Sequence, residues 1–101
     1  MNQCIFICDK KWNIEEILDS TWDLPIKEDK TLTDLITEPD ILENNDEFEL
    51  HKQNVKMVRF YGEEQEVPAI ICTFPKWYLI FLVCIQSQED FLSFLSIYMK
   101  C

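Results

Sequence analysis

Short apolar runs separated by polar turns dominate the beginning of the chain and predict strands there. The run from Cys4 to Cys8 is continuously apolar and ends at the charged turn Asp9-Lys10-Lys11, as expected of a buried strand. The next apolar positions, from Trp12 to Leu18, fit either a second strand or one helical turn. The short turn between the two runs favours a hairpin.

Two helix signals follow this hairpin. A proline and a polar stretch over residues 25–30 form a loop. Because a threonine hydroxyl accepts hydrogen bonds from first-turn amides, Thr31 or Thr33 is expected to cap a short helix that Pro39 limits. Asparagines followed by two acids then predict a second helix, over residues 44–54.

The second half of the chain is rich in β-forming residues, which occur in three runs at 56–61, 66–74 and 77–86. Gly62 and its polar neighbours mark one reversal and Pro75-Lys76 marks the next, so three antiparallel strands are predicted. The last run shows no polar alternation, which indicates that both of its faces are covered.

From Ser87 the pattern becomes helical. Ser87 and Asp90 resemble a capping box, and the apolar residues beyond them recur at spacings of three and four. This stripe supplies the candidates for an interface or connector, which are Phe91, Leu92, Phe94, Leu95 and Tyr98. Because neither glycine nor asparagine caps its end, we expect residues 87–101 to be the first part of a longer connector helix. Residues 1–86 are then one domain.

Composition narrows the partners and the location. Nineteen acidic residues against nine basic ones give a net charge of −10, which disfavours nucleic acid and anionic membranes as partners. The longest apolar stretch, Trp77 to Ile85, is too short to cross a bilayer, and the N-terminus has no signal-peptide pattern. We expect a soluble, cytoplasmic protein whose five cysteines are reduced and act as small hydrophobic residues.

Few residues are suited to catalysis or metal binding. The chain has one histidine and one glycine, and it has no phosphate-binding glycine loop or cysteine pair at metal-ligand spacing. We therefore expect no enzyme activity and no metal site. The acidic residues Glu63, Glu64 and Glu66 are interpreted as a solvated turn. The polar neighbours of His51 favour a solvent-facing histidine.

The order of the predicted elements indicates an α+β fold, with a five-stranded antiparallel sheet, short helices on one face and a C-terminal helix. This order resembles the PAS domain. The segment from Leu32 to Asp40 is similar to the family's helix followed by a proline-acid pair, and Cys4 to Ile17 is similar to its opening hairpin. A glycine is usual in that opening turn, where this chain has Lys10-Lys11-Trp12.

The resemblance implies that two N-terminal and three C-terminal strands share one sheet around a helical segment, upstream of a histidine kinase or another signalling output. In haem-binding members a histidine in this region is the proximal ligand, so His51 is the haem candidate here. A small apolar ligand between helices and sheet is another option, although ordinary core packing explains the same residues. The candidate lining consists of Phe6, Leu35, Ile36, Phe48, Ile71 and Phe81.

Three functions follow as hypotheses. The first is a non-catalytic sensory or dimerisation module of a signalling protein, which transmits through its C-terminal helix to a downstream domain in the same chain. Its outer sheet face needs a cover, either its own helix or a second subunit, and a homodimer is the economical expectation. The second is a stand-alone acidic adaptor or inhibitor that binds a basic partner. The third, a small enzyme or haem carrier, has no motif behind it.

Overall fold

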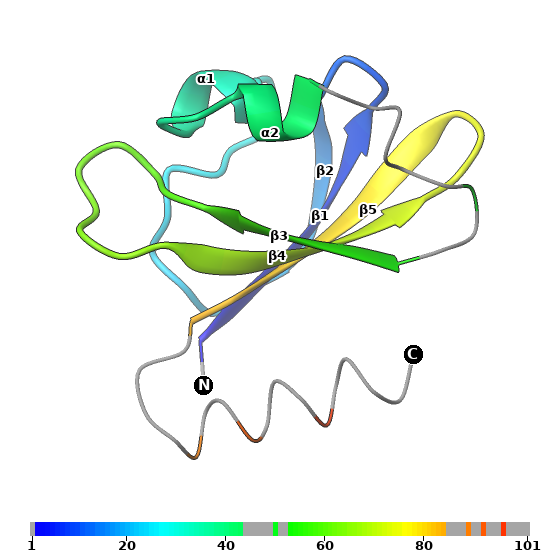
Figure 1. The fold of residues 1–101 in the computed structure, drawn as a ribbon. Coiled ribbons are helices and arrows are strands. Elements are labelled where there is room, and N and C mark those ends of the chain that lie inside the picture. Colours follow the sequence, from blue (N-terminus) through cyan, green and yellow to red (C-terminus); the bar gives the residue numbers. More distant parts are fainter. Residues whose placement is uncertain are drawn as a thin grey trace.

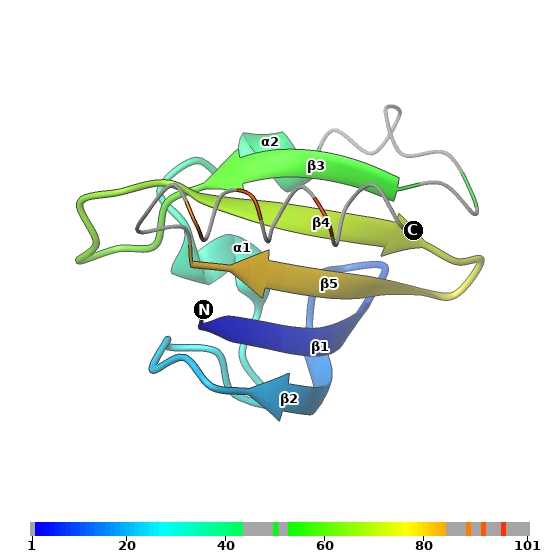
Figure 2. The same ribbon diagram turned by 90° about the horizontal axis from the view of Figure 1, so that it is seen from below.

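Five strands form a single antiparallel sheet in the computed structural model, which describes residues 2–43, 50, 53–84, 89, 92 and 96. The strands are β1 (Gln3–Asp9), β2 (Ile14–Ser20), β3 (Gln53–Val58), β4 (Val67–Thr73) and β5 (Trp77–Val83). Their order across the sheet is β2-β1-β5-β4-β3 (Figure 2). The first and last strands in the sequence, β1 and β5, therefore lie side by side inside the sheet. The predicted five-stranded antiparallel sheet is confirmed.

Two short helices, α1 (Leu32–Leu35) and α2 (Asp40–Glu43), lie over one face of this sheet (Figure 1). Helix α1 ends because Ile36 adopts an extended conformation and forms a β-bridge with Phe60. Thr31 occupies the predicted N-cap position but makes no capping hydrogen bond. Its hydroxyl instead donates to the Asn13 side-chain oxygen at 2.7 Å, so the predicted capping role is wrong.

The second predicted helix is wrong at its end and falls largely outside the described residues. Gln53 and Asn54 belong to β3, where they pair with Cys72 and Ile71 of β4. Cross-strand pairing with an apolar neighbour outweighs the local helix signal there. Helix α2 lies earlier, directly after Pro39, whose carbonyl accepts hydrogen bonds from the amides of Leu42 and Glu43. Proline is favoured at such helix starts, because its missing N–H needs no partner there.

One face of the sheet carries the main core. Alternate residues of β1 and β5 are almost fully buried there, since Cys4, Phe6 and Cys8 lie opposite Leu82, Ile80 and Tyr78. The short helices and loops cover this face with apolar side chains, which include Leu32, Ile36, Leu42 and Phe60. The core therefore joins the first and last strands to the helices and loops between them.

The opposite face carries a second and smaller hydrophobic cluster. Ile70 and Val83 are 3% and 0% exposed, and partly buried Val55, Cys72 and Phe81 pack against them. On this face of β5 the cover is complete at Val83 and partial at Leu79 and Phe81, so the prediction that both faces are covered is confirmed in part. Of the predicted helix over residues 87–101 only Glu89, Leu92 and Ser96 are described, with exposed side chains, so that helix stays a prediction.

The turn between β1 and β2 is closed by Asp9 and Trp12. Trp12 has a φ of 68°, in the left-handed region that suits glycine, and its amide donates to the Asp9 carbonyl at 3.0 Å. Its indole stacks on the Tyr78 ring with 4.1 Å between centroids and 2° between planes. The Lys10 ammonium lies 3.9 Å from the centroid of the same ring. Stacking on β5 compensates the strain in a turn that lacks glycine.

Replacing Trp12 with glycine tests this balance. Trp12→Gly relieves the left-handed strain but removes a buried indole, so we expect a loss of about 2–4 kcal/mol in the free energy of unfolding, measured by chemical denaturation. Asp29→Gly is the matched control, because Asp29 has a φ of 72° and is exposed. It should change stability by less than about 1 kcal/mol. Equal effects of the two variants would contradict the stabilising role of the stack.

The Asp9 carboxylate is the hydrogen-bond acceptor of this turn. It accepts from the amides of Lys11 and Asn13 at 2.9 Å each, and from the Asn13 side-chain nitrogen at 3.0 Å. Burial by itself would raise the pKa of Asp9, but these hydrogen bonds outweigh it and lower the pKa. A carboxyl group with a lowered pKa stabilises the fold when it is ionised.

This contribution has a defined pH dependence. Because the folded pKa of Asp9 lies below the unfolded value of about 4, its stabilisation is complete above that pH and is lost as the pH falls through the folded pKa. The difference in unfolding free energy between the wild type and Asp9→Asn should therefore be constant above about pH 5 and shrink in more acidic solution. Asn13→Ala should weaken the same dependence. A difference that does not change with pH would contradict the assignment.

Candidate functional site

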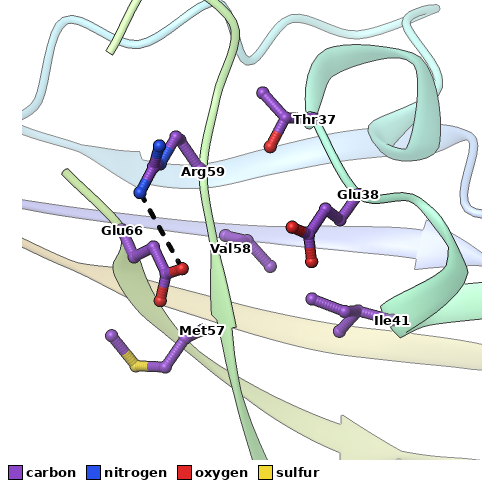
Figure 3. A pocket seen from close by; sticks show the side chains of 7 residues that line it. All are labelled: Thr37, Glu38, Ile41, Met57, Val58, Arg59 and Glu66. Carbon is purple, nitrogen blue, oxygen red and sulfur yellow. Dashed lines mark ion pairs between the residues drawn. The ribbon is translucent and has the colours of Figure 1, made fainter. Parts of the chain in front are cut away.

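A small pocket lies between the α1–α2 connection and β3 (Figure 3), where the Thr37 amide donates to the Arg59 carbonyl at 2.8 Å. Its volume is about 80 Å³, well below the roughly 300 Å³ at which small-molecule sites begin. The lining residues are Thr37, Glu38, Ile41, Met57, Val58, Arg59 and Glu66. The pocket has room for a few water molecules but is too small for a cofactor.

The ion pair beside this pocket is weak. The Arg59 guanidinium and the Glu66 carboxylate are 4.0 Å apart, and the two side chains are 47% and 51% exposed. At this distance and exposure a salt bridge contributes at most about 1 kcal/mol. The arginine therefore neutralises Glu66 only in part.

A larger groove, here called the acidic groove, has a volume of about 440 Å³. It lies at the end of the sheet where the loop after β2 and the turn between β3 and β4 flank the end of β5, on the left in Figures 1 and 2. The described lining residues are Trp22, Leu24, Phe60, Gly62, Glu63, Glu64, Gln65, Glu66, Val67 and Cys84. Its volume falls within the range of known ligand sites.

Backbone contacts fix both walls of the acidic groove. Gly62 reverses the chain with a φ of 88°, a conformation that glycine adopts without strain, and the Glu63 amide donates to the Phe60 carbonyl at 3.1 Å. On the other wall, the Thr21 amide donates to the Gln3 carbonyl at 2.9 Å. The groove is thus formed by a turn that is closed by its own backbone hydrogen bond and by a loop that is held to β1.

The lining divides into an apolar part and an acidic part. Leu24, Phe60 and Cys84 are buried, and Trp22 and Val67 are partly buried. Three further lining residues are exposed glutamates, namely Glu63, Glu64 and Glu66. The predicted solvated turn is confirmed for these glutamates. The sequence analysis did not predict that this turn forms one wall of a groove, because the loop that forms the other wall is far from it in the sequence.

The predicted ligand-pocket residues lie in the sheet and helices rather than around either cavity. Phe6, Ile36 and Ile71 are buried in the main core, and Leu35 packs against it. Phe81 belongs to the second cluster, on the opposite face of the sheet, so it cannot line one cavity with the others. Phe48 lies outside the described residues. In the described part of the chain, these side chains serve as core.

Of the predicted connector residues, Leu92 is described and is 58% exposed. Phe91, Phe94, Leu95 and Tyr98 lie outside the described residues, as does His51, the haem candidate.

Cys4 and Cys8 form no disulfide among the described residues, and the reduced state of the five cysteines stays a prediction. Burial raises the pKa of the Cys4 and Cys8 thiols, which keeps them protonated and unreactive.

Within the described ranges, no group of three or more histidine, cysteine or acidic residues is placed to hold a metal ion. No helix among the described residues is long and apolar enough to cross a membrane. Comparisons with models of protein families, with curated proteins and with solved structures give no match.

Thr73 Oγ1 and Asn54 Nδ2 are buried polar atoms that have no hydrogen-bond partner among the described residues. Both residues lie on the face of the sheet that carries the main core, since Asn54 pairs with Ile71 and Thr73 follows two positions later on β4. Thr73 is 3% exposed. An unpaired buried hydroxyl costs about 1–3 kcal/mol.

Valine at position 73 should therefore stabilise the protein. Thr73→Val keeps the shape and removes the unpaired hydroxyl, so the free energy of unfolding should rise by about 1 kcal/mol. The matched control is Thr31→Val, because the Thr31 hydroxyl donates to Asn13. The free energy of unfolding of Thr31→Val should fall by about 1 kcal/mol, because this hydrogen bond is lost. Destabilisation by both substitutions in denaturant titrations would show that the Thr73 hydroxyl contributes favourably to the fold.

Proposed function

We propose that this chain is a PAS-like, non-catalytic sensory or dimerisation module of a cytoplasmic signal-transduction protein, for example a histidine kinase. The observation that carries the proposal is the position of β5. This last described strand lies between β1 and β4 at the centre of the sheet, and the chain leaves it at Cys84 toward the predicted connector. A displacement of core residues that contact β5 therefore has a direct path to the exit point.

The topology supports the PAS-like part of the proposal. Two N-terminal and three C-terminal strands share one sheet around a helical segment, which is the arrangement that the resemblance implies. The opening hairpin also ends its first strand at an aspartate, Asp9. The departure at the turn is accommodated, because Trp12 takes the left-handed conformation that a glycine would provide.

The contacts of β5 support transmission. Ile80 and Leu82 are fully buried toward the main core, and Val83 is fully buried in the cluster on the opposite face. The Cys84 amide donates to the Asn2 carbonyl at 2.9 Å, which holds the exit from β5 beside the residue that precedes β1. A strand that is held on both faces can pass a displacement of the core to the segment that follows it.

One exposed apolar residue supports the dimerisation part of the proposal. Leu92 is 58% exposed and lies in the predicted apolar stripe, and a second copy of the same chain is one partner that covers such a stripe. A downstream domain in the same chain receives the signal. A bound small ligand is not required for this role.

Measurement of molecular mass in solution tests the proposal. Sedimentation equilibrium from micromolar to millimolar concentration should give twice the mass of one chain, and Leu92→Glu should shift the equilibrium toward monomer because a charge is costly in an apolar interface. Leu18→Glu is the matched control, since Leu18 is 50% exposed on the edge strand β2. It should leave the mass unchanged. A monomer throughout that range would contradict dimerisation.

A further inference from the structure

We propose that the acidic groove binds a basic segment of a partner protein that inserts an apolar or aromatic side chain between the two loops. The groove has a charged rim and an apolar interior, and these two properties select the same kind of occupant. This proposal does not rest on the signalling role proposed above, because it concerns a surface that a module or an adaptor would present equally.

The charge of the rim selects a cationic partner. Glu63 and Glu64 are exposed, carry no ion pair among the described residues, and lie within a chain of net charge −10. Glu66 is only partly compensated by Arg59. The described lining of the groove contains neither lysine nor arginine. Arg59 contacts Glu66 from outside this lining. Such a potential attracts a basic segment and repels carboxylates, phosphates and nucleic acid.

The apolar interior selects a partner that carries more than charge. Leu24 and Phe60 are 8% and 1% exposed, and the partly buried Trp22 indole lies beside them in the lining. The apolar surface that remains open to an occupant belongs to the partly buried Trp22 and Val67, and an apolar side chain placed there removes this surface from water. A lysine or arginine next to that side chain can contact the indole face. A simple metal ion would use none of these groups, since it needs convergent oxygen ligands.

The geometry favours a peptide segment rather than a large flat surface. A volume of about 440 Å³ holds one or two large side chains, and interface energy concentrates at such anchors in pockets. A backbone hydrogen bond between Glu63 and Phe60 closes the β3–β4 turn, and one between Thr21 and Gln3 holds the facing loop to β1. Little conformational entropy is therefore lost on binding. The acidic groove is thus suited to a short basic sequence with one apolar anchor.

Calorimetric titration with capped short peptides tests this inference. The probe is a peptide in which phenylalanine is flanked by lysine and arginine. One comparison peptide has serine in place of phenylalanine, and another has glutamate in place of the basic residues. We expect the first peptide to bind at least about ten times more tightly than either comparison peptide, and added salt to weaken it. Amide chemical shifts should change at residues 22–24 and 60–67.

Charge-matched variants distinguish the groove from general electrostatic attraction. The combined substitutions Glu63→Gln, Glu64→Gln and Glu66→Gln should lower the affinity for the first peptide at least about ten-fold. The control carries Glu16→Gln, Glu28→Gln and Glu43→Gln, which remove the same charge at exposed positions outside the groove and should alter binding less than about three-fold. Equal weakening by both sets, equal binding of the serine peptide, or shift changes confined to other regions would each overturn the proposal.

Discussion

Pairing of β1 with β5 is the interaction on which the rest of the structure depends. Seven residue pairs, from Gln3 opposite Val83 to Asp9 opposite Trp77, join the first strand to the last described one. Among the strand pairings of the described residues, this one alone joins the β1–β2 hairpin to β3, β4 and β5. The main core forms beneath it, because Phe6 and Ile80 are opposite each other and both are fully buried. Such non-local contacts close most of the chain into a loop, at an entropic cost that the buried core must offset.

The opening turn strengthens the same pairing at its far end. Trp12 belongs to the turn between β1 and β2, but its stacking partner, Tyr78, belongs to β5. The strain of the left-handed conformation is therefore offset by a contact with β5 rather than by a contact within the hairpin. Asp9, which pairs with Trp77, organises the turn from the strand side through its bonds to Lys11 and Asn13. A glycine would form this turn without strain, but it would not connect the turn to β5.

Sequence patterns predicted the strands well, because their apolar runs are bounded by strong turn signals. Gly62 and Pro75 mark both reversals of the second half, and strand ends there agree to within a few residues.

Prediction was wrong where local preference competed with distant partners. Asn54 carries a helix signal but pairs with Ile71, and Thr31 stands at a helix start but donates to Asn13. The acidic groove was not foreseen for the same reason, since its walls come from segments that have no local relation. Likewise, Phe81 looked equivalent to Phe6 as an apolar strand residue, and only the register of β5 assigns it to the opposite face.

The acidic groove and the exit of β5 share one residue. Cys84 is buried, follows β5 directly, lines the groove and donates its amide proton to the Asn2 carbonyl. An occupant of the groove would therefore contact the point at which the central strand leaves the sheet. If the conformations of that exit differ in how well they fit the occupant, binding changes their populations in proportion to the difference in affinity. The two proposals are independent in their evidence but meet at this position, where a basic partner would act on the segment that carries the output.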